Sequence, residues 1–169
     1  MSAWWSRQLE ELIETPGLQR ELRRGRRYAE EGRVSSLDVS AGRVSALIQG
    51  TRPAPYRVHL DIAVLSDEDW DHALQELFAH AGAWLALKGG QMPTMARRWH
   101  LVPREPIEVM LRCSCPVRDL FCKHTAAAVY ALAAETAQAP VLLFQWRGRG
   151  PHAIDALWAQ RARRKGSVA

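Results

Sequence analysis

All three cysteines of this chain and one histidine fall within residues 113–124, in the sequence CSCPVRDLFCKH. Three thiolates and one imidazole form a complete tetrahedral ligand set for Zn²⁺, and four protein ligands leave no position for a substrate. The fold must therefore bring four side chains to one point. We predict one structural zinc ion, held by Cys113, Cys115, Cys122 and His124.

Other uses of these residues fit the sequence less well. An odd number of cysteines excludes complete pairing as disulfides, and a bridge between Cys113 and Cys115 would close a strained ring. A catalytic pair of Cys122 and His124 would need the two side chains to face each other, but residues two apart at a helix start point in different directions. Reduced, buried thiols without a metal are a third alternative.

The residues around the cluster predict a strand, a turn and a helix. Residues 107–111 (IEVML) are a β-prone run that leads to Cys113, and a knuckle at 114–116 must turn both sulfurs toward one ion. Cys122 and His124 precede the run 125–134 (TAAAVYALAA), which is rich in strong helix formers. The dipole of this helix would also favour negative thiolates at its start.

The spacing Cys-x-Cys-x6-Cys-x-His, in the form CSCP…CKH before an alanine-rich helix, resembles the SWIM zinc finger, which we place at about 107–135. The resemblance to bacterial SWIM-finger proteins extends to further blocks, at 25–29, 32–34, 46–50, 55–58, 89–93 and 143–148. It implies contact with DNA or protein and no enzymatic activity. It also implies an association with helicase-like ATPases.

Alternating patterns predict an α+β fold built on a small antiparallel β-sheet. The β-rich runs 33–39 and 44–50 are separated by SAGR at 40–43, which is a hairpin signal. Apolar and polar residues alternate along 56–65, which predicts a third strand and a three-stranded meander.

Helical patterns predict helices packed on this sheet. One stripe covers 18–30, and shorter helices are expected before Trp146 and after Pro151. A further helix starts at Ser66 as N-cap and ends at Gly89-Gly90. Its predicted buried face consists of Trp70, Leu74, Leu77, Phe78, Ala81, Trp84 and Leu85.

Length and composition predict one small domain over residues 1–169. The chain has 169 residues, of which 47% are hydrophobic, enough for a single core. We see no signal peptide and no apolar run of transmembrane length. Unpaired cysteines suit a reducing compartment, so we expect a cytoplasmic protein without a membrane partner or a small-molecule substrate.

Basic residues indicate a polyanionic partner, since the net charge is +5 and the pI is about 9.6. One group lies on one face of the helix 18–30, and another in a basic C-terminal helix and tail at about 147–169. Two more cations lie inside the finger. The candidate nucleic-acid residues are Arg20, Arg23, Arg24, Arg27, Arg118, Lys123, Arg161, Arg163, Arg164 and Lys165. The alternative is a solvated surface, partly neutralised on the first helix by Glu21, Glu30 and Glu31.

The sequence thus predicts a noncatalytic zinc-binding module that binds nucleic acid, with DNA favoured, through arginine contacts to phosphates. The alternative is a protein-interaction subunit of a helicase-like ATPase complex.

Overall fold

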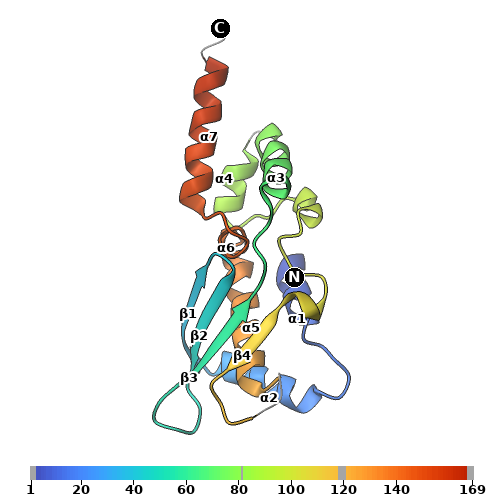
Figure 1. The fold of residues 1–169 in the computed structure, drawn as a ribbon, viewed down its shortest axis with the longest axis vertical. Helices are drawn as coiled ribbons and strands as arrows, with labels where there is room; N and C mark the ends of the chain where they lie inside the picture. Colours follow the sequence, from blue (N-terminus) through green and yellow to red (C-terminus); the bar gives the residue numbers. More distant parts are fainter. Residues whose placement is uncertain (1–2, 81, 118–120, 167–169) are drawn as a thin grey trace.

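The computed structural model describes residues 3–80, 82–117 and 121–166, with side chains up to residue 163 (Figure 1). Within these ranges the α-helices are α1 (Trp4–Glu11), α2 (Gln19–Glu30), α3 (Asp67–Ala79), α4 (Ala83–Lys88), α5 (Lys123–Gln138), α6 (Val141–Trp146) and α7 (Pro151–Gly166). The 3-10 turns are η1 (Thr94–Arg98) and η2 (Pro106–Glu108). The strands are β1 (Val34–Ser40), β2 (Arg43–Ile48), β3 (Tyr56–Asp61) and β4 (Met110–Cys113). The predicted α+β class is confirmed.

The strands form one antiparallel sheet in the order β1-β2-β3-β4. The predicted meander is present, and β4 extends it by pairing with β3. Strand β4 begins later than the β-prone run 107–111 suggested. The reason is the turn η2, in which Pro106 and a reciprocal capping box between Glu105 and Glu108 hold a 3-10 conformation.

The two faces of the sheet differ in polarity, as expected for an antiparallel sheet covered on one side. Val44, Ile48 and Val58 are fully buried on the inner face, where α5 lies behind the strands (Figure 1). The outer face carries polar side chains, among them Arg43 and Asp61, whose side chains are joined by two hydrogen bonds.

Helix α5 is the centre of the helical layer. Its small side chains allow close packing, and residues 126–128, all alanines, have no exposed surface. Helices α1 and α2 both pack against it. The indole of Trp5 donates a hydrogen bond to the backbone oxygen of Thr136 in α5 (2.7 Å), so this N-terminal tryptophan folds back over the core.

The long helix expected after Ser66 is divided into α3 and α4. Gly82 has a left-handed φ of +78° and interrupts the helix there. Trp70 and Trp84 are buried as predicted, but Leu85 is 66% exposed, so its assignment to the buried face was wrong. The break changes the direction of the chain, and Leu87 takes the buried position instead. Ala81 lies outside the described residues.

Arg147 belongs to the core although the sequence placed it in the basic C-terminal segment. Its side chain is buried and donates to the backbone oxygens of Leu101 (3.1 Å) and Ala63 (2.8 Å). Its guanidinium also lies 3.7 Å from the carboxylate of Glu108. Burial lowers the pKa of Arg147. This arginine therefore ties two loops together and is not part of the basic surface.

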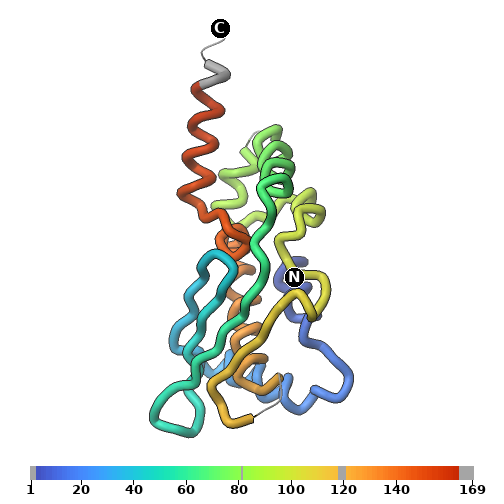
Figure 2. The backbone as a smooth tube through the Cα atoms, viewed as in Figure 1, coloured from blue at the N-terminus to red at the C-terminus, as the bar shows by residue number. Residues whose placement is uncertain are grey.

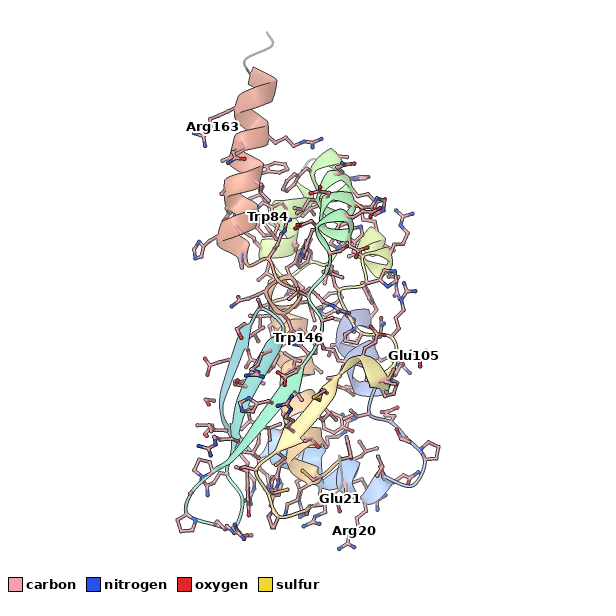
Figure 3. All side chains as sticks on the ribbon, in the orientation of Figure 1. Arg20, Glu21, Trp84, Glu105, Trp146 and Arg163 are labelled. Atoms are coloured by element: carbon pink, nitrogen blue, oxygen red, sulfur yellow. The ribbon has the colours of Figure 1, made fainter. Side chains whose placement is uncertain are left out.

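The fold is elongated, and its two basic regions lie at opposite ends. The backbone trace runs from α2 and the loop between β4 and α5 at one end to the tip of α7 at the other (Figure 2). Arg20 and Arg163 mark these ends in Figure 3. The basic face of α2 and the described arginines of α7 therefore do not join into one band. None of the described helices has the length and apolar character needed to span a membrane.

Candidate metal centre

Strand β4 brings Cys113 to the centre through its pairing with β3. Cys113 lies opposite Val58 in the register. The pairing continues for one more residue, because Ser114 N–H donates to Arg57 O (2.9 Å) and Arg57 N–H donates to Ser114 Oγ (2.9 Å). The chain then bends at 115–116. This is the predicted knuckle, and it turns Cys115 toward the same point as Cys113.

Cys122 is the N-cap of α5, and Thr125 fixes it there. Cys122 N–H donates to Thr125 Oγ1 (2.9 Å), and the Thr125 hydroxyl donates back to Cys122 O (2.8 Å). These bonds satisfy backbone groups that a helix start otherwise leaves unpaired. His124 follows in the first turn of the helix and is buried.

The four predicted ligands come together in the structure. The ligand atoms of Cys113, Cys115, Cys122 and His124 all lie within 4.8 Å of one another. His124 Nδ1 is 3.8 Å from Cys113 Sγ and 3.9 Å from Cys122 Sγ. Zn–S bonds of about 2.3 Å and Zn–N bonds of about 2.0 Å in a tetrahedron require ligand separations of roughly 3.5–3.8 Å. The donor set and its spacing therefore fit Zn²⁺.

The thiols of Cys113 and Cys122 influence each other's pKa through a hydrogen bond. A hydrogen bond from Cys113 lowers the pKa of Cys122 to about 3, and the same interaction together with burial raises the pKa of Cys113. This hydrogen bond thus favours the thiolate form of Cys122, at the N-terminus of α5. The centre can supply a thiolate, which is the form that binds metal.

Two tyrosine rings flank the imidazole of His124. The Tyr56 ring stacks on it at 4.3 Å between ring centroids with 29° between the planes, and the Tyr28 ring is tilted by 57° at 5.8 Å. His124 Nε2 is buried and has no hydrogen-bond partner in the described part of the chain. Gly50 lies against this edge, since a Cβ there would be 3.5 Å from Nε2. The imidazole is thus held by ring contacts.

The SWIM zinc finger family model matches residues 101–133, which contain all four of these residues. This part of the chain is therefore similar to a SWIM zinc finger. It is also 38% identical, over 152 residues, to an uncharacterized protein of Mycobacterium tuberculosis. That match covers 86% of this chain and 55% of the relative, so the chain spans about half the length of the curated relative it matches. No solved structure was found to match.

Three cationic side chains lie over the rings of Tyr28 and Tyr56, which flank His124. Lys123 Nζ lies 5.0 Å and Arg33 Cζ 4.7 Å from the Tyr28 ring centroid, and Arg52 Cζ lies 5.8 Å from that of Tyr56. Of these three, only Arg33 has a carboxylate partner among the described residues, which is Glu31. Sequence reasoning predicted Lys123 here but missed Arg52 and both tyrosines.

The structure divides the predicted basic face of α2. Arg20 and Arg23 are exposed and make no ion pair within the described ranges. Arg24 pairs with Glu21 at 3.4 Å, and Arg27 lies 3.5 Å from Glu31. The alternative, a solvated face partly neutralised by glutamates, therefore applies to Arg24 and Arg27.

The other predicted cations lie either in α7, at the other end of the structure, or outside the described residues. Arg161 and Arg163 belong to α7, which lies at the opposite end of the fold from the finger (Figure 1). Arg118 lies outside the described residues, as do the side chains of Arg164 and Lys165.

Proposed function

We propose that this chain is a noncatalytic zinc-binding module that binds nucleic acid, DNA in the first place, through the basic surface at its finger end. One observation carries the proposal: a compact Cys3His set lies directly beside cations that lack carboxylate partners in the described part of the chain. The finger match supports the zinc, and the charge distribution supports the polyanion.

The four clustered residues would hold a single ion. When bound, Zn²⁺ would link the end of β4 to the start of α5. Cys113 would bind it from the end of β4 and Cys115 from the knuckle, while Cys122 would bind it as the N-cap of α5 and His124 from the first turn of that helix. Because all four ligands come from protein, no position is left for a substrate, which supports a binding role over a catalytic one.

The cations would bind phosphates without reading bases. Arg20 and Arg23 project from α2, and Lys123 and Arg52 lie on the rings beside His124. The backbone of Lys123 lies against Gly25, which brings the start of the finger helix next to α2. Such contacts release counterions, so affinity should fall steeply with salt.

A matched pair of variants tests this proposal. Zinc content is measured first, by elemental analysis of freshly reduced protein and of Cys122→Ser. Duplex DNA and RNA binding is then titrated against salt for the wild type, Arg20→Gln/Arg23→Gln and Arg161→Gln/Arg163→Gln. We expect one zinc per chain, and a salt slope that flattens by about 0.9 per lost phosphate contact only in the α2 variant. Zinc-free protein, or zinc-loaded protein that binds no nucleic acid at low salt, would reject the proposal.

A second candidate is the protein-interaction subunit, with a helicase-like ATPase as the partner class suggested by the SWIM resemblance. It is favoured by exposed apolar side chains at the start of the finger: Ile107 is 92% exposed and Met110 is 56% exposed. The capped turn η2 holds Ile107 in place. Isolated exposed apolar residues are common, so this observation is weaker than the clustered cations. Loss of a copurifying ATPase in Ile107→Ser/Met110→Ser would favour this candidate.

A further inference from the structure

The imidazole of His124 presents its two nitrogens to different surroundings. Nδ1 faces the sulfurs of Cys113 and Cys122, at 3.8 and 3.9 Å. Nε2 is buried on the other side, near Gly50, without a hydrogen-bond partner among the described residues. A metal bound at this centre would therefore meet Nδ1.

Metal-binding histidines are normally oriented by a hydrogen bond from the second ring N–H to a carboxylate, a backbone oxygen or water. His124 has no such protein partner in the described part of the chain. A contact with the face of the ring can also select the rotamer that turns Nδ1 toward the thiols.

The ring of Tyr56 makes the closest contact that can do this. It stacks nearly flat on the imidazole, at 4.3 Å, whereas the Tyr28 ring is farther away and tilted. Tyr56 is itself held at the start of β3, paired with Ile48 of β2, and is only 9% exposed. Gly50 leaves room for the ring, because a Cβ at that position would lie 2.5 Å from Tyr56 Cε2.

We propose that Tyr56 is a positioning residue of the metal centre, whose ring holds His124 so that Nδ1 is the metal-binding nitrogen. This inference rests on the proposed zinc site. The phenol oxygen has no part in it, since stacking needs only the aromatic ring.

The first measurement determines the nitrogen directly. Long-range ¹H–¹⁵N spectra of the zinc-loaded wild type distinguish a metal-bound Nδ1 with a protonated Nε2 from the reverse. We expect the first pattern for His124. A metal-bound Nε2 would overturn the inference while leaving zinc binding intact. A wild type that takes up no zinc would instead overturn the proposed function.

The second measurement compares Tyr56→Phe with Tyr56→Leu. Phenylalanine keeps the ring, and leucine keeps a buried apolar side chain without it. Zinc affinity, measured by competition with a chelator, should stay within about twofold in Tyr56→Phe and fall about 10- to 100-fold in Tyr56→Leu, the range seen when groups that orient a ligand are lost. Equal affinities in the two variants would overturn the inference. If Tyr56→Leu fails to fold, the nitrogen assignment in the wild type and in Tyr56→Phe still decides.

Discussion

Gly25 of α2 and Ala126 of α5 meet so closely that no side chain fits between the two helices. A Cβ on Gly25 would overlap the Cβ of Ala126 and would lie 2.9 Å from both Ala127 N and Lys123 O. Two of these neighbours are backbone atoms, which cannot move aside without shifting the helix. This contact sets the distance between the basic helix and the start of the finger helix.

Gly25→Ala should therefore destabilise the protein, although alanine is the better helix former. Overpacking of this kind costs about 1–3 kcal/mol. Urea unfolding measures the loss. Adding Ala126→Gly should recover part of it, because the methyl clash is removed while the backbone contacts stay. A Gly25→Ala protein as stable as the wild type would show that the helices are not packed this closely.

Gly50→Ala should weaken zinc binding, because the new methyl group would displace the Tyr56 ring from His124. The matched control is Gly89→Ala, where a Cβ would lie 3.4 Å from its nearest neighbour and φ is negative. Chelator competition should show a loss in the first variant and none in the second. Identical affinities would contradict the described contact.

Arg147→Met should destabilise the fold, because it removes a buried donor from the backbone oxygens of Leu101 and Ala63. Leaving a buried acceptor without its partner costs about 1–3 kcal/mol. Arg149→Met is the control, since Arg149 pairs with the exposed carboxylate of Asp67 and should cost less than about 1 kcal/mol. Denaturant midpoints of the two variants give the comparison. Similar midpoints would show that the buried contacts of Arg147 do not stabilise the fold.

Glu76 should contribute stability that depends on pH. A hydrogen bond from the Trp99 indole (2.6 Å) and the nearby Arg98 guanidinium lower the pKa of its carboxyl group. A lowered folded-state pKa gives stability that is present above the unfolded value of about 4.3 and is lost as pH falls through the folded value. The stability gap between the wild type and Glu76→Gln should therefore be full at pH 7 and close in acid. A gap that does not change with pH would refute this.

Removing zinc should unfold at least the finger segment. Structural zinc contributes on the order of 10 kcal/mol, similar to the net stability of a whole domain. After chelation, hydrogen exchange at residues 107–134 should become fast, while the β1–β2 hairpin serves as the internal reference. Unchanged protection of residues 107–134 after confirmed zinc removal would contradict a structural role.

Local sequence patterns predicted the elements of the finger well. The spacing of Cys113, Cys115, Cys122 and His124 and the alanine run identified the strand, knuckle and helix, because the ligands are close neighbours in the sequence. The hairpin at residues 40–43 was equally clear from its turn residues.

Contacts between distant segments were not predictable in the same way. Tyr56 was expected as part of the alternating strand 56–65 and of the SWIM-like block 55–58, and nothing near it in the sequence points to His124. Arg147 was assigned to the basic C-terminal segment because of its charge. Its burial depends on two loops, which contact it through Leu101 and Ala63. The exposure of Leu85 follows from the left-handed turn at Gly82, which periodicity does not reveal.

The wide separation of Tyr56 from the four ligands has a consequence for the order of folding. Closing the short loop between the cysteines costs little chain entropy, so the ligand set can gather before most of the chain is folded. The stacking of Tyr56 on His124 requires β3 to be aligned with β2 and β4, a much longer closure. Metal capture should thus proceed in two kinetic stages, a fast loose association followed by a slower tightening when the sheet is complete.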